Sequence, residues 1–132
     1  MNNDTVNDEN DSSPVLDRSF LQEIFALAGA EPEAFLVEMI DCYLEATPNL
    51  IEAIQNAIAD SDLNALQRAA HTLKSNSVSV GACGLANYCQ QLEAIDKSDS
   101  IKSQAKVLLQ EMEIQYLETK EALLIERQRY QP

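Results

Sequence analysis

The chain has 132 residues, enough for one domain with a buried core. Its 22 acidic residues outnumber 9 basic ones, giving a net charge of −13, and this argues against nucleic acid or an anionic membrane as a partner, because both require a basic face. With only 3 glycines and 4 prolines, turn-rich β folds are disfavoured and a helical protein is expected.

The first 14 residues form an acidic segment without helical periodicity. They contain four acidic residues, no basic residue, and, after the initial methionine, Val6 as the one large apolar side chain. This composition predicts a disordered tail over residues 1–14. The folded domain is accordingly expected over residues 15–132.

A short helix is predicted at the start of the folded domain. Asp17 is a suitable N-cap, and Gly29 is a suitable C-terminal stop. The apolar stripe of this helix is predicted to consist of Phe20, Ile24, Leu27 and Ala28.

A second helix is predicted from Pro32 to Ala59, because proline is favoured in the first turn. The Thr47-Pro48 pair permits either a kink or a break. One long kinked helix is favoured, because the apolar pattern resumes without loop residues. Its inward stripe is predicted to comprise Phe35, Met39, Tyr43 or Cys42, Ala46, Leu50, Ile54, Ala57 and Ile58.

Three further helices complete the expected architecture. Asp62 is predicted to cap a helix that runs to about Val80, with Gly81 as its stop. A helix over 82–96 follows, then a loop over 96–100 and a last helix over 101–129. Short links favour antiparallel neighbours, so we expect an all-α, antiparallel up-down four-helix bundle with a short extra N-terminal helix. The predicted inward residues are Leu85, Cys89, Leu92 and Ile95, then Ile101, Ala105, Leu108, Met112 and Tyr116.

Cysteine usage and hydropathy give expectations about the compartment. Cys42, Cys83 and Cys89 are odd in number and irregularly spaced, so a disulfide framework is not expected and a reducing cytoplasm is. All three lie on apolar stripes and are interpreted as small core residues. The chain opens without a secretory signal and has no run of about 18 apolar residues, so neither secretion nor a membrane span is expected.

The single histidine lies on the polar face of its predicted helix. A helical wheel places His71 about 140° from the centre of the apolar arc. Arg68 and Lys74 flank it, which favours a neutral imidazole and an arriving anion. The geometry alone is equally compatible with an ordinary surface histidine that has no chemical function. The apolar arc is Leu63, Leu66, Ala70, Leu73, Ser77 and Val80; the outer neighbours are Asn64, Gln67, Arg68, Lys74, Ser75 and Val78.

Two catalytic alternatives fit the sequence poorly. A serine hydrolase would use Ser75, Ser77 or Ser79, but no strand-turn-helix elbow or glycine-rich oxyanion loop is present. A zinc site would need His71 and cysteines that face the opposite way, so no metal site is expected. The acidic residues of the last helix are interpreted as a solvated face: Glu111, Glu113, Glu118, Glu121 and Glu126.

Residues 69–82, AAHTLKSNSVSVGA, closely resemble the phosphorylation motif of histidine-containing phosphotransfer (HPt) domains, A-H-x-L-K-G-S-S followed by G-A. The similarity continues through Leu85, Cys89 and Leu92-Glu93, and the helix order agrees over about 16–129. Two positions depart from the family pattern. Ser75 stands where glycine is common, and Asn76 stands where serine is common; the latter is expected to affect packing.

The resemblance implies a phosphocarrier of a two-component phosphorelay, without catalytic power of its own. His71 would accept phosphate from a receiver-domain aspartate through Nε2 and pass it to another receiver, with Lys74 neutralising charge and Arg68 steering. The implied docking surface is Asn64, Gln67, Arg68, Ser75 and Val78. Receiver domains and a hybrid histidine kinase are the implied partners, with Mg²⁺ on the receiver and the carrier monomeric. Two alternatives stay open: a non-phosphorylated helical adaptor, and the phosphotransfer module of a chemotaxis-type kinase.

Overall fold

The computed structural model describes residues 15–96 and 100–131. The predicted tail over 1–14 and part of the predicted 96–100 loop lie outside these ranges. Within them the chain forms helices and no strand: α2 (Arg18–Leu27), α3 (Pro32–Ala59), α4 (Leu63–Ser79), α5 (Cys83–Glu93) and α6 (Ile101–Tyr130). None of these helices is long and apolar enough to cross a membrane.

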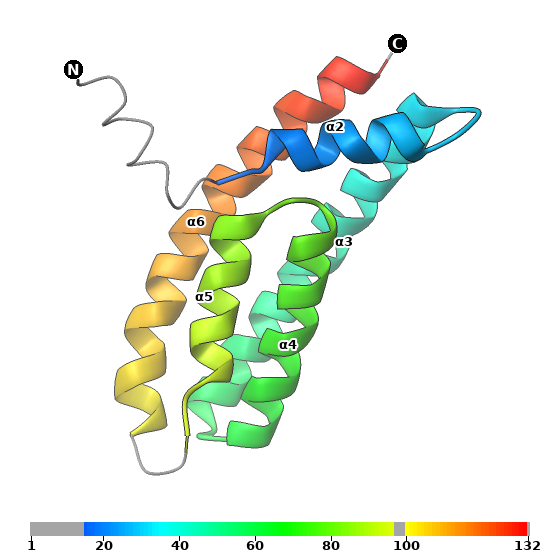
Figure 1. The fold of residues 1–132 in the computed structure, drawn as a ribbon. Helices are drawn as coiled ribbons and strands as arrows, with labels where there is room; N and C mark the ends of the chain where they lie inside the picture. Colours follow the sequence, from blue (N-terminus) through cyan, green and yellow to red (C-terminus); the bar gives the residue numbers. More distant parts are fainter. Residues whose placement is uncertain (1–14, 97–99, 132) are drawn as a thin grey trace, which may run out of the picture.

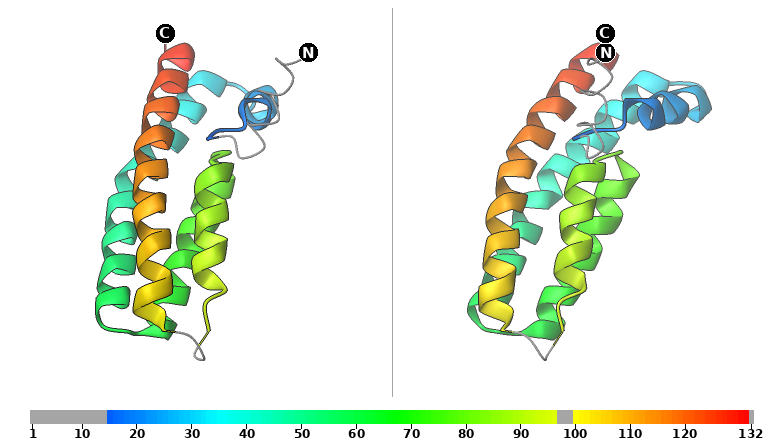
Figure 2. Two further views of the ribbon diagram at one scale, coloured as in Figure 1. Left: turned by 90° about the vertical axis from the view of Figure 1, so that its left-hand side faces the viewer. Right: turned by 60° about the vertical axis from the view of Figure 1, so that its left-hand side comes forward.

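Helices α3 to α6 form an antiparallel bundle, and α2 lies across the end of it where α4 turns into α5 (Figure 1). Helix α4 packs against α3 and α5, and α6 closes the ring against the same two helices. The views in Figure 2 show the same crossing of α2 over the bundle end. The predicted four-helix bundle with a short N-terminal helix is confirmed.

Aspartate caps begin two of the helices as predicted. The Asp17 side chain accepts a hydrogen bond from the Phe20 amide at the start of α2, and Asp62 accepts one from Ala65 at the start of α4. Each cap satisfies an amide that has no intrahelical acceptor.

Gly81 ends α4 and holds α2 in place. It adopts φ +76°, a left-handed conformation that glycine adopts without steric cost. Its carbonyl accepts a 2.8 Å hydrogen bond from the Asp17 amide. The turn between α4 and α5 is thereby tied to the start of α2.

Helix α3 runs unbroken through Pro48, as favoured from the sequence. Thr47 Oγ1 donates to the Tyr43 carbonyl at 2.6 Å within the same region. The predicted inward stripe of the first half is right at Tyr43, partly right at the half-buried Met39 and Ala46, and wrong at Phe35. Leu36, Ile40 and Tyr43 are buried, whereas Phe35 is 50% exposed. Two adjacent rows of α3 carry apolar side chains, so periodicity alone did not separate them.

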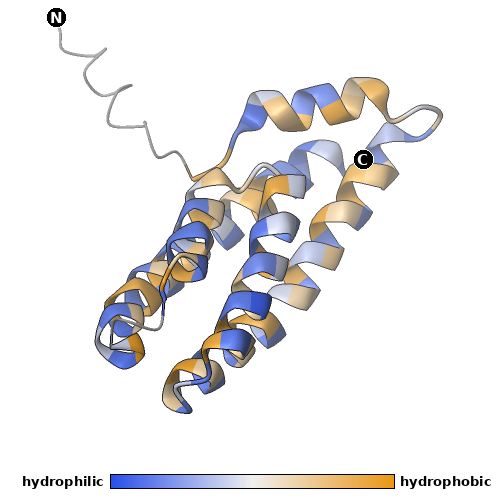
Figure 3. Cartoon of the chain, turned by 60° about the horizontal axis from the view of Figure 1, so that its bottom comes forward, coloured by the Kyte–Doolittle hydropathy of each residue, from blue (hydrophilic) through white to orange (hydrophobic). Residues whose placement is uncertain are grey.

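The core lies between the four bundle helices, and Figure 3 shows apolar and polar residues alternating around each of them. The inward residues predicted for α5 and α6 are buried or half-buried. In α2 the buried residue is Leu21, which the prediction omitted, and Leu27 is 85% exposed. Helix α2 crosses the bundle end, so only a narrow strip of it reaches the core.

Two expectations about polar and thiol groups need correction. Glu126 does not belong to the solvated face of α6: it is buried, and its Oε2 lies 2.6 Å from Arg18 Nε and 3.3 Å from Arg129 Nε. Of the cysteines, only Cys89 is a core residue, and burial raises the pKa of its thiol to about 12. Cys83, at the start of α5, is half-buried, and Cys42 is exposed because its neighbour Tyr43 takes the inward position of α3.

Candidate functional site

His71 lies near the middle of α4 on the outer face. Its side chain is 61% exposed, while Ala70 and Leu73 on either side are fully buried. On the buried face of α4, the Tyr43 and Ser77 hydroxyls form a 2.7 Å hydrogen bond that ties α4 to α3. The outward orientation predicted from the helical wheel is confirmed.

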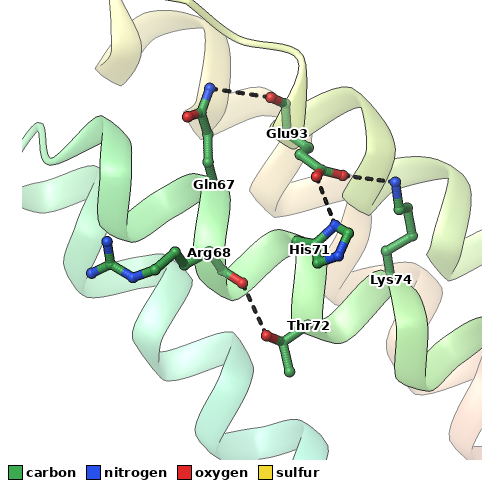
Figure 4. Close-up of polar contacts among 6 residues, drawn as sticks. All are labelled: Gln67, Arg68, His71, Thr72, Lys74 and Glu93. Atoms are coloured by element: carbon green, nitrogen blue, oxygen red, sulfur yellow. Dashed lines mark hydrogen bonds and ion pairs between the residues drawn. The ribbon is translucent and has the colours of Figure 1, made fainter.

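A carboxylate from the neighbouring helix completes the site. Glu93, the last residue of α5, places Oε2 2.8 Å from His71 Nδ1 and Oε1 2.8 Å from Lys74 Nζ (Figure 4). Sequence analysis placed only cations beside the imidazole. Glu93 neutralises part of that positive charge, so the site is a three-residue network instead of a purely basic patch.

Electrostatics keep the Glu93 carboxyl of this network ionised. The hydrogen bond from the Lys74 ammonium is the largest cause and lowers the pKa of the Glu93 carboxyl; desolvation opposes it, and the His71 contact lowers the pKa further. The group is therefore ionised at neutral pH and can only accept hydrogen bonds. It follows that Nδ1 of the neutral imidazole carries the proton, and that Nε2 keeps its lone pair.

Two residues of the predicted docking surface, Gln67 and Arg68, make hydrogen bonds within the bundle. The Gln67 amide is half-buried and donates to the backbone carbonyls of Glu93 and Ile95. The Arg68 side chain extends away from His71, and its carbonyl accepts a hydrogen bond from Thr72 Oγ1 (Figure 4). The structure therefore places Lys74, and not Arg68, beside the imidazole.

Residues 38–124 match the family model of the Hpt domain. The chain belongs to the Hpt domain family. The matched segment begins within α3 and contains all of α4 and α5, hence the whole His71 network.

A solved structure of another Hpt protein has the same fold. It is histidine-containing phosphotransfer protein B (HptB) from Pseudomonas aeruginosa PAO1. The two chains are 26% identical and superpose with a TM-score of 0.73, over 89% of this chain and 98% of that one. Comparison with curated proteins gives no match. The family and the fold together make this chain a histidine phosphotransfer protein of a phosphorelay.

Arg68 and the three remaining residues predicted for the Hpt docking surface are exposed. Asn64, Ser75 and Val78 all face outward, and Val78 is 56% exposed. Next to Lys74 and Val78 lies an open hollow of about 360 Å³ between α4, α5 and the start of α2. The remaining residues lining it are Asp17, Phe20, Gly81, Cys83, Ala86, Asn87 and Gln90.

The described part of the chain has no group of three or more histidine, cysteine, aspartate or glutamate side chains arranged to hold a metal ion. Of the serines considered for a hydrolase, Ser77 is buried against Tyr43, and Ser79 Oγ donates to the Ser75 carbonyl.

Glu93 is the residue that sequence reasoning left without a role. The Leu92-Glu93 pair was part of the family pattern, but 22 residues separate Glu93 from His71, and only helix packing brings them together.

Proposed function

We propose that this Hpt protein carries its phosphoryl group on Nε2 of His71, taking it from the aspartyl phosphate of one receiver domain and passing it to the aspartate of another. The observation that carries the proposal is the exposed imidazole whose Nδ1 is held by Glu93. A ring oriented in this way directs its free lone pair away from the protein, where a docked partner can reach it.

The transfer step requires little covalent chemistry from the bundle. The Nε2 lone pair forms the new N–P bond while the P–O bond of the aspartyl phosphate breaks, and the aspartate carboxylate leaves with the electron pair. The proton stays on Nδ1, so the phosphorylated ring carries positive charge opposite the Glu93 carboxylate. The attraction between the imidazole ring and the Glu93 carboxylate therefore strengthens as the N–P bond forms. An interaction that is stronger in the transition state than in the ground state accelerates the reaction.

Lys74 is proposed to neutralise the phosphoryl oxygens as a point charge. Its ammonium is half-buried and anchored to Glu93 at 2.8 Å, so it is held beside the imidazole before a partner arrives. The receiver is proposed to supply the acidic residues and Mg²⁺. A hybrid histidine kinase would supply the donor receiver. One copy of the chain suffices, because His71, Lys74 and Glu93 all come from it.

The proposal is tested by incubating the protein with a labelled, phosphorylated receiver domain. The expected product is a base-stable, acid-labile phosphate on the carrier. The His71→Gln variant should acquire none while retaining its helical circular dichroism spectrum and its binding to the receiver. Label that persists in His71→Gln would falsify the site.

The same experiment separates the two alternatives. A helical adaptor would bind the receiver without acquiring phosphate under conditions in which a known carrier is labelled. A chemotaxis-type phosphotransfer module would be labelled by a kinase ATP-binding domain with ATP and not by the phosphorylated receiver.

A further inference from the structure

Residues on one face of α4 contact both the backbone carbonyl and the side-chain carboxylate of Glu93. Gln67, His71 and Lys74 are spaced four and three residues apart, so they follow one another along that face. His71 and Lys74 contact the carboxylate. Gln67 Nε2 donates to the carbonyl of Glu93 at 3.3 Å and to that of Ile95 at 3.1 Å, as Figure 4 shows for the first of these bonds.

The position of Glu93 explains why the backbone contact matters. Glu93 is the last residue of α5, and the final carbonyls of a helix have no intrahelical donor. The Ala94 amide bonds to the carbonyls of Gln90 and Gln91, and the Ile95 amide bonds to that of Leu92. The Glu93 carbonyl instead receives the Gln67 amide.

Helix ends are where local opening begins. Opening of the last turn of α5 would move the Glu93 carboxylate away from the imidazole. The predicted helix over 82–96 extended past this point, whereas α5 ends at Glu93, so the residue that orients His71 stands at the terminus itself. A donor from α4 at this terminus fixes the turn against the helix that carries the histidine.

We infer that Gln67 is a positioning residue for phosphoryl transfer: it closes the last turn of α5 and thereby holds the Glu93 carboxylate at His71 Nδ1 and Lys74. The inference rests on the proposed function of His71. It also changes the role of Gln67, whose amide is committed to α5 and is not free for a receiver.

The test compares donors at position 67. Gln67→Met keeps the length and helix propensity and removes the donor, and Gln67→Ala is a second truncation. Gln67→Arg restores donors that can reach helix-terminal carbonyls. Gln91→Met makes the same change at an exposed glutamine of α5 and is the matched control.

The first measurement does not depend on phosphate. His71 is the single histidine of the chain, so nitrogen NMR of the imidazole reports the fraction of neutral rings protonated on Nδ1. We expect this fraction to fall in Gln67→Met and Gln67→Ala, to recover in Gln67→Arg, and to stay at the wild-type value in Gln91→Met.

The second measurement is the initial rate of phosphorylation by phosphoramidate, a small donor that needs no docking surface. Loss of the two Gln67 hydrogen bonds is expected to slow it about threefold to tenfold, with recovery in Gln67→Arg. Wild-type imidazole signals and rates in Gln67→Met would overturn the inference. The inference would also be overturned if Gln67→Met slowed transfer from a receiver but not phosphorylation by phosphoramidate, because Gln67 would then be a docking contact. If the imidazole signals respond but even wild-type protein accepts no phosphate, the positioning stands and the proposed function fails.

Discussion

The Glu93→Gln variant keeps the length of the side chain and removes its charge. Glu93 now offers one carboxylate oxygen to His71 Nδ1 and the other to Lys74, each at 2.8 Å. An amide has a single acceptor oxygen. If that oxygen stays with His71, Lys74 loses its partner. If it turns to Lys74, the amide donor faces Nδ1 and favours the tautomer whose Nε2 is protonated and cannot attack.

The size of the effect follows from exposure. Two unit charges 4 Å apart interact by about 1 kcal/mol in water and about 4 kcal/mol at an effective dielectric constant of about 20. The His71 side chain is 61% exposed, so the contact lies near the lower limit, in the range found for exposed ion pairs. A loss of about 1 kcal/mol from the transition state, where the ring gains positive charge, slows transfer about fivefold.

The assay measures the initial rate of phosphate transfer from a labelled receiver over a range of receiver concentrations. Glu118→Gln, at an exposed position of α6, makes the same change in net charge away from the site and is the control. We expect the maximal rate to fall in Glu93→Gln with little change in the half-saturating concentration. A maximal rate within about twofold of that of Glu118→Gln would refute the reasoning.

Three further predictions follow from the structure. Lys74→Ala should slow phosphoryl transfer about tenfold or more, because it removes a group placed to meet the phosphoryl charge. Arg68→Ala should change the transfer rate less than about twofold, because the Arg68 side chain extends away from His71. Equal effects of the two substitutions would contradict the assigned roles. Gly81→Ala should destabilise the fold by about 1–2 kcal/mol, because φ is +76° and the new Cβ would lie 3.0 Å from a backbone oxygen; thermal denaturation checks this. Finally, the pKa values of Glu93 and Asp41 are held below 4.5 and 3.8, by Lys74 and by the Arg127 hydrogen bond respectively. At a pH near these values the unfolded chain therefore binds more protons than the folded one. The wild-type protein should have a higher free energy of unfolding than a Glu93→Gln/Asp41→Asn double variant at neutral pH. This difference should shrink as the pH falls below about 4.5 and the carboxylates become protonated. Urea titrations would show an unchanging difference if the contacts contribute nothing.

Local features of the fold were predictable because they depend on neighbours along the chain. The caps at Asp17 and Asp62 require only a short acceptor at a helix start. The outward orientation of His71 follows from the spacing of apolar residues within α4 itself. The continuity of α3 through Pro48 was favoured because the apolar pattern resumes directly after it.

Other features depended on how the helices pack. In α3 two adjacent rows are apolar, and contact with its neighbours buries Leu36 and Ile40 and leaves Phe35 exposed. Glu126 resembled the other acidic residues of α6, yet it is buried beside Arg18 because α2 crosses the end of the bundle.

The sequence by itself therefore determined a helical bundle with one histidine directed outward and Lys74 one turn away, since helical periodicity is a local property. Only the tertiary structure decided what that histidine contacts. The rotation and offset of α5 against α4 bring the Glu93 carboxylate to His71 and Lys74, and the Gln67 amide to the end of α5. Interhelical geometry arises from side-chain packing across the interface, so periodicity within either helix does not specify these contacts.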